Sequence, residues 1–118
     1  MAKHNNTGKE GESLAAAYLQ QKGFIIHYSN WRYSHYEIDI IASSNDILHF
    51  VEVKTRRSLQ FGFPEESVTP KKLQHLIDAA EVFLYQFPQW KRVQFDVLSL
   101  MLVTGKEPEY FFIEDVYL

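Results

Sequence analysis

Residues 47–54 read Ile-Leu-His-Phe-Val-Glu-Val-Lys, an alternating pattern that predicts a β-strand ending in two opposite charges. Side chains two positions apart project from the same face of a strand, so Glu52 and Lys54 should stand side by side. Large apolar residues, Leu48 and Phe50, share that face. Because an ion pair taken out of water rarely stabilises a protein more than an apolar pair, this pair indicates a functional site.

A second acid interrupts the apolar run Ile38-Asp39-Ile40-Ile41-Ala42, thirteen residues before Glu52. Aspartate is disfavoured inside strands, and the Ser-Ser-Asn-Asp sequence at 43–46 predicts a turn between the two strands. The resulting hairpin could bring Asp39 close to Glu52. Two adjacent carboxylates repel each other and a divalent cation removes that repulsion, and oxygen ligands with retained waters suit Mg²⁺ or Mn²⁺.

The flanking sequence predicts two helices. Thr7 and Glu10 form a capping box for a helix that runs to about residue 22 and ends at Gly23. Gly11 inside this helix has no helix-propensity reason and suggests close packing. A second helix is expected to begin with Thr69 as its cap and Pro70 in its first turn, and to end before residue 88.

The predicted fold is one α/β domain over residues 1–118. The expected strands are residues 24–32, 36–42, 47–54, 93–103 and 110–116, and residues 55–69 are expected to form a loop. The element order is therefore α-β-β-β-α-β-β. Asp96 lies in an apolar strand, where we expect a structural hydrogen-bonding or ion-pair role, and His49 is expected to be a packed core or edge residue.

Length and composition limit the classes of protein. The chain has 118 residues, 46% hydrophobic and 15% aromatic, which is enough for one domain with its own core. It has no cysteine, so disulfides and thiolate metal sites are excluded. Its first residues are polar and its apolar runs are too short to span a membrane, so we expect a soluble cytoplasmic protein without a membrane partner.

Charge is segregated along the chain. The formal net charge of −3 argues against a protein that coats DNA, but less against an enzyme whose acidic site is neutralised by bound cations. Basic residues cluster after the third strand and at the start of the second helix: Arg56, Arg57, Lys71 and Lys72. The acidic net charge and short length favour a homodimer or a protein partner.

The ordered set of motifs resembles the PD-(D/E)xK nucleases, which have the restriction-endonuclease-like fold and include archaeal Holliday-junction resolvases. The pattern is an acid in the first helix, Glu12, then Asp39 in the second strand, then Glu52-x-Lys54 at the end of the third.

Nearly the whole chain is similar to the small bacterial YraN-like proteins. That similarity rests on Gly8-x-x-Gly11-Glu12, Ala16-x-Tyr18-Leu19, Gly23-Phe24, Glu37 to Ala42, Phe50 to Arg56, Val68, Lys71-Lys72 and Phe95-Asp96-Val97. The chain departs from it at Tyr36, where glycine is common, and at Gln94, where a basic residue is expected.

The resemblance implies a restriction-endonuclease-like core, with a mixed central sheet flanked by helices, that hydrolyses phosphodiester bonds. Asp39, Glu52 and the backbone carbonyl of Val53 would hold Mg²⁺ or Mn²⁺, and Glu12 would bind that ion's water or a second ion. Lys54 would contact the nucleophilic water or the scissile phosphate. Four basic side chains would grip flanking phosphates without reading sequence: Arg56, Arg57, Lys71 and Lys72.

Several alternatives stay open. The Glu52–Lys54 pair is also compatible with an ordinary exposed ion pair, and Glu12 with an early-helix acid that complements the helix dipole. The aromatic residues Trp31, Tyr33 and Tyr36 fit hairpin packing better than base stacking. At the level of the whole protein, the alternatives are a catalytically silent module that binds nucleic acid or protein, and a small interaction subunit. DNA is favoured over RNA, and branched or flapped DNA rests on the resolvase likeness alone.

Overall fold

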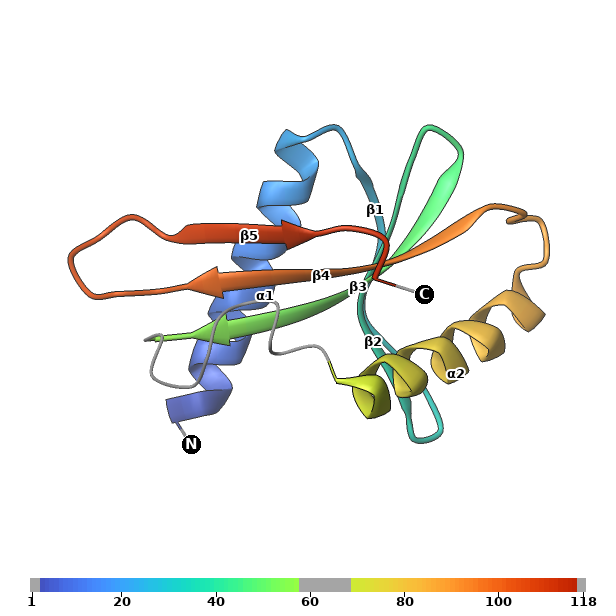
Figure 1. Ribbon diagram of the computed structural model, residues 1–118, viewed down its shortest axis with the longest axis horizontal. Coiled ribbons are helices and arrows are strands. Elements are labelled where there is room, and N and C mark those ends of the chain that lie inside the picture. Colours follow the sequence, from blue (N-terminus) through green and yellow to red (C-terminus); the bar gives the residue numbers. More distant parts are fainter. Residues whose placement is uncertain (1–2, 58–68, 117–118) are drawn as a thin grey trace.

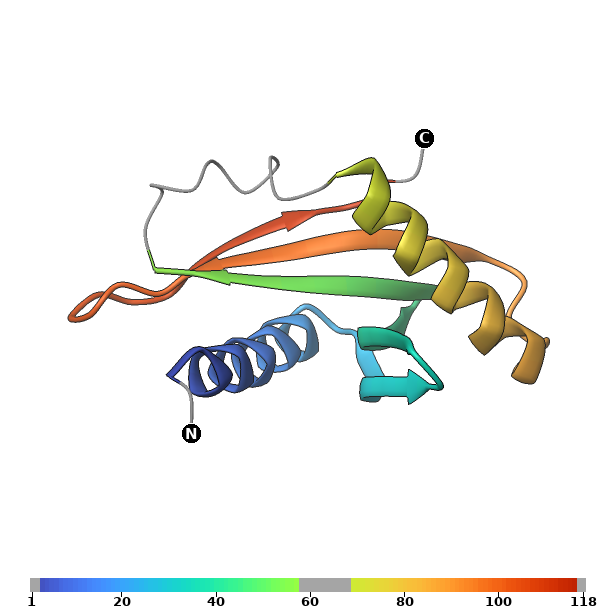
Figure 2. The same ribbon diagram turned by 90° about the horizontal axis from the view of Figure 1, so that it is seen from below.

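The structure is a computed structural model that describes residues 3–57 and 69–116. Five strands form one sheet in the order β1-β2-β3-β4-β5, with a helix on each face (Figures 1 and 2). The elements are α1 (Lys3–Gln21), β1 (Ile25–Tyr33), β2 (Tyr36–Ser44), β3 (Ile47–Arg56), α2 (Pro70–Gln86), β4 (Val93–Met101) and β5 (Glu109–Ile113). Strands β3 and β4 are parallel and the other neighbours are antiparallel. The predicted α/β class, element order and mixed sheet are confirmed.

Each helix covers its own core. Helix α1 buries Ala15 and Leu19 against Val51 of β3 and against Leu98 and Leu100 of β4. Helix α2 buries the stripe that contains Leu76 and Phe83 against the other face of the sheet. No helix in the described part of the chain is long and apolar enough to cross a membrane.

Strand β2 changes its orientation at Asp39. Ile38 packs toward α2, whereas Ile40, two residues further on, packs toward α1. In a regular strand these two side chains would share one face. The pairing of β2 with β3 stops at the same place, because its last partners are Ile40 and Val51. The two strands therefore part at Asp39, and the candidate site lies at this opening.

Helix α1 can approach β3 closely because Gly11 has no side chain. A Cβ atom at this position would overlap the side chain of Thr55 near the end of β3. The expectation of close packing at Gly11 is confirmed. This approach carries Glu12, the next residue, to the opening between β2 and β3.

Several predicted boundaries are wrong. Helix α1 begins at Lys3, four residues before Thr7, because residues 3–6 contain no proline or glycine to end it. Strand β2 continues to Ser44, and the hairpin turn consists only of Asn45 and Asp46, with φ of 53° and 64°. Strand β3 extends to 56, β4 stops at 101 and β5 spans 109–113.

Candidate active site

Asp39 closes the gap where β2 leaves β3. Its Oδ2 atom accepts a hydrogen bond of 2.8 Å from the backbone N–H of Val53. The side chain thus provides the partner that the main chain of β2 would have given in a continued ladder. Val53 stands between Glu52 and Lys54 in the sequence. The bond therefore fixes one carboxylate oxygen of Asp39 next to these two residues.

The surroundings of Asp39 disfavour its negative charge. Burial raises the pKa of Asp39 from 3.8 to about 6, and the hydrogen bond from Val53 opposes that rise only in part. The carboxylates of Glu52, Glu12 and Glu37 raise it further. A cation bound among these groups would remove both the desolvation and the repulsion.

Glu52 and Lys54 stand side by side, as the period-two pattern predicted. Lys54 Nζ lies 3.1 Å from Glu52 Oε2, and both side chains are half-buried. With Asp39, they line a cavity of about 230 Å³ on the α2 side of the sheet. Glu37 lines the same cavity and forms an exposed ion pair of 3.7 Å with Arg32. Three carboxylates and an ammonium therefore line one cavity.

A second cavity, of about 470 Å³, lies on the α1 side. It is lined by Glu12 together with Asp39, Val53 and Lys54, among others. Asp39 and Lys54 border both cavities, so the two spaces meet at these side chains. All four predicted catalytic residues are thus brought together at one opening in the sheet.

Glu12 is in the body of helix α1 and not at its start. The interpretation of Glu12 as a complement to the helix dipole is wrong, because the helix begins nine residues earlier and the dipole acts mainly on the first turn. Glu12 Oε1 instead accepts a hydrogen bond of 2.9 Å from Asn30 Nδ2. Asn30 belongs to strand β1 and has a left-handed φ of 55°.

The four predicted basic residues are placed differently. Arg56, the last residue of β3, is half-buried. Arg57 lines the α1-side cavity and lies 3.4 Å from Glu10. The Lys54 ammonium beside Lys72 lowers the pKa of Lys72, so this first-turn residue of α2 lies at the site. Lys71, in the same turn, is exposed like Lys72, and neither lysine is among the described residues that line the two cavities.

Over residues 11–100 the chain matches the model of a family described as uncharacterised protein family UPF0102. The chain belongs to family UPF0102. A UPF0102 protein of Bacteroides fragilis is 40% identical over 105 residues, which cover 89% of this chain and 87% of that protein. The UPF0102 protein of Phocaeicola vulgatus is 44% identical over 101 residues, covering 86% and 84%. That of Rhodococcus opacus is 41% identical over 118 residues, covering 99% and 100%.

The segment that the UPF0102 model matches holds the whole cluster at the opening. It starts at residue 11, just before Glu12, and ends at residue 100, so it includes strands β1 to β3, helix α2 and all of β4 except its last residue. Asn30 also lies within it, although sequence reasoning did not select this residue. The local signal was an asparagine in the middle of a predicted strand, where asparagine is disfavoured. Asparagine also tolerates positive φ better than most residues.

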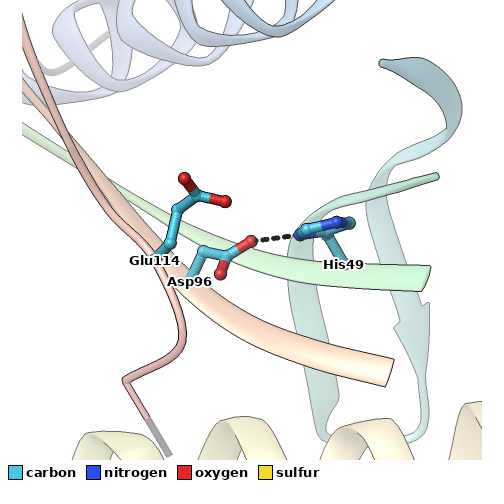
Figure 3. Close-up of side chains that lie close together, drawn as sticks. All are labelled: His49, Asp96 and Glu114. Carbon is cyan, nitrogen blue, oxygen red and sulfur yellow. Dashed lines mark hydrogen bonds and ion pairs between the residues drawn. The ribbon is translucent and has the colours of Figure 1, made fainter. Parts of the chain in front are cut away.

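A second cluster of metal-ligand types lies away from this opening. The ligand atoms of His49, Asp96 and Glu114 are within 4.8 Å of one another (Figure 3). However, Asp96 Oδ2 is 2.6 Å from His49 Nδ1, and Asp96 Oδ1 accepts 2.9 Å hydrogen bonds from Gln94 Nε2 and the backbone N–H of Asp115. Both oxygens are therefore occupied, and the cluster fastens the segment after β5 to β4. The predicted structural roles of Asp96 and His49 are confirmed.

Proposed function

We propose that this UPF0102 protein is a metal-dependent nuclease of the PD-(D/E)xK superfamily that hydrolyses phosphodiester bonds of DNA. The proposal rests on the raised pKa of Asp39 and on its position between two cavities. Its pKa is raised to about 6 by burial and by three neighbouring carboxylates, at a point where two cavities meet beside Lys54. Such a costly cluster of anions is typical of a functional site and not of a stabilising one.

The donor set fits a hard divalent cation. Carboxylate oxygens of Asp39 and Glu52, with the backbone carbonyl of Val53, are the ligand types that Mg²⁺ and Mn²⁺ prefer. Glu12 would bind that ion's water or a second ion from the α1 side. When bound, the ion would polarise the phosphate and supply an activated water. Asp39 has one oxygen held by Val53, so its other oxygen is oriented for a ligand.

Lys54 is placed to act on the reacting atoms. Its ammonium pairs with Glu52 and borders both cavities, so a phosphate entering from either side would reach it. There it would orient the nucleophilic water or neutralise charge that grows in the transition state. Lys72 places a second ammonium beside it, and Arg57 extends the positive charge along the α1-side cavity. Arg56 and Lys71 would add outer phosphate contacts.

DNA that is branched or flapped is the substrate we favour, by analogy with the resolvases. The acidic net charge of −3 and the short chain favour a homodimer or a protein partner that would supply part of the DNA-binding surface. The competing function is a binding module that keeps the fold without cutting. The two differ in what metal binding does, because only the nuclease needs it for turnover.

The deciding experiment combines Mn²⁺ calorimetry with cleavage of branched, flapped and single-stranded DNA. Asp39→Asn keeps the shape of the side chain and removes its charge, and Asp46→Asn makes the same change in the exposed β2–β3 turn. We expect wild type and Asp46→Asn to bind Mn²⁺ and to cut, and Asp39→Asn to do neither. DNA binding without cutting by wild type, on all substrates and with Mn²⁺ bound, would favour the binding module. Cleavage that persists in Asp39→Asn would overturn the proposed site.

A further inference from the structure

Asn30 occupies an unusual position in the middle of strand β1. Its neighbours Ser29 and Trp31 pair with Ile40 and Ile38 of strand β2, so Asn30 lies opposite Asp39. Its φ of 55° is left-handed, whereas strand residues have negative φ. Such backbone conformations persist where the surrounding structure enforces them, and they are common at functional sites. The position therefore requires an explanation beyond strand packing.

The side chain of Asn30 joins helix α1 to this point of the sheet. Its Nδ2 atom donates a 2.9 Å hydrogen bond to Glu12 Oε1. Glu12 in turn lines the α1-side cavity together with Asp39 and Lys54. Asn30 thus holds one oxygen of a carboxylate that lines the same cavity as Asp39.

The kind of donor matters here. Glu52, also a proposed ligand, has a cationic partner in Lys54 at 3.1 Å, and Glu10 has one in Arg57 at 3.4 Å. Glu12 and Asp39 are held instead by neutral N–H groups, from the Asn30 amide and the Val53 backbone. A neutral donor orients a carboxylate without cancelling its charge. The full charge then remains for a cation.

We propose that Asn30 is a positioning residue that orients Glu12 toward a divalent cation at Asp39, an inference that rests on the proposed function above. Asn30 acts through Glu12 and does not itself contact the reacting atoms. It serves the site in the way that hydrogen-bond partners of metal ligands do, and loss of such partners typically weakens metal binding roughly 10–100-fold.

The test compares two glycine substitutions by Mn²⁺ calorimetry on the full chain. Asn30→Gly removes the amide donor, and glycine accepts the positive φ. Asn45→Gly is the matched control, because Asn45 has a similar φ of 53° but lies in the β2–β3 turn. We expect Asn30→Gly to weaken Mn²⁺ binding roughly 10–100-fold and Asn45→Gly to bind like wild type.

A double-substitution cycle with Glu12→Gln separates positioning from general structural damage. If Asn30 acts through Glu12, Asn30→Gly adds nothing once Glu12 has lost its charge, so the double variant binds Mn²⁺ as Glu12→Gln does. Independent losses that multiply would overturn the positioning role, as would unchanged binding in Asn30→Gly. A wild-type chain that binds no Mn²⁺ would overturn the proposed function itself. These two failures are therefore distinguishable.

Discussion

Val53 donates its backbone N–H to the carboxylate of Asp39 across the point where β2 parts from β3. The side chain of Asp39 therefore links the two strands where their backbone pairing has ended. Asp39 also lies near the carboxylates of Glu52, Glu12 and Glu37. The two roles have opposite effects on the ionised carboxylate. The hydrogen bond lowers the pKa of Asp39, but burial and the nearby carboxylates outweigh it.

The first prediction concerns stability against pH without metal. The pKa of Asp39 is higher in the folded chain, at about 6, than its ordinary value of 3.8, so protonation favours folding. The contribution is complete below about pH 4 and is lost as the pH rises through about 6, a change of about 3 kcal/mol. Asp39→Asn mimics the protonated group and should be more stable than wild type near neutral pH by a similar amount.

Urea unfolding of both proteins at several pH values measures this difference. Asp46→Asn is the control, because it removes an exposed turn carboxylate and should follow the wild-type curve. If Asp39→Asn and wild type differ by the same amount at every pH, the carboxylate of Asp39 is not the group that titrates.

The second prediction concerns metal affinity against pH. A cation must displace the proton from Asp39, so the apparent Mn²⁺ affinity should rise about tenfold per pH unit below about 6 and level off above it. Calorimetry in buffers of different ionisation enthalpy would show the release of one proton in the rising part. An affinity that does not vary over this range would mean that Asp39 is not a ligand.

The third prediction separates Lys54 from the metal ligands. Lys54→Met removes the ammonium but keeps an unbranched side chain between the two cavities. Glu52 then loses its cationic partner, so Mn²⁺ binding should be unchanged or tighter, while DNA cleavage falls roughly 10²–10⁴-fold. Lys91→Met, at an exposed position outside the site, should leave both unchanged. A loss of metal binding in Lys54→Met would show that the lysine supports the ligands and not the chemistry.

Much of the site could be predicted because its signals are local. The period of two in β3 placed Glu52 beside Lys54, and the apolar context marked Asp39 as unusual. Thr69 does cap α2, since its side chain accepts from the N–H of Lys72, so that helix start was also predictable.

The remaining features depend on long-range geometry. Asn30, with its left-handed φ, lies opposite Asp39 of β2 and bonds to Glu12 of α1, and no short window of the β1 sequence contains these partners. The contact between His49 and Asp96 joins residues 47 positions apart, and it requires the parallel register of β3 with β4. Helix α1 also extends past its capping box, because a cap marks a favourable start without preventing an earlier one.

The fourth prediction tests the approach of α1 to β3. Gly11→Ala would place a Cβ against the Thr55 side chain, so it should destabilise the fold by roughly 1–3 kcal/mol, and any shift of α1 would move Glu12 away from Asp39. Gly8→Ala lies in the same helix with open space around the new Cβ and should be neutral or stabilising by up to about 1 kcal/mol. Equal unfolding midpoints for the two variants would contradict the close packing.

The fifth prediction distinguishes the cluster of His49, Asp96 and Glu114 from the candidate site. Asp96→Ala leaves the His49 ring, the Gln94 amide and the Asp115 N–H without their acceptor, so it should destabilise the chain by roughly 3–5 kcal/mol. In the fraction that remains folded, Mn²⁺ affinity should equal that of wild type, because the residues of this cluster do not line either cavity of the site. Denaturant unfolding and calorimetry on the same preparation give both quantities. If Asp96→Ala instead kept wild-type stability and lost Mn²⁺ binding, the cation would bind at the His49 cluster and not at Asp39.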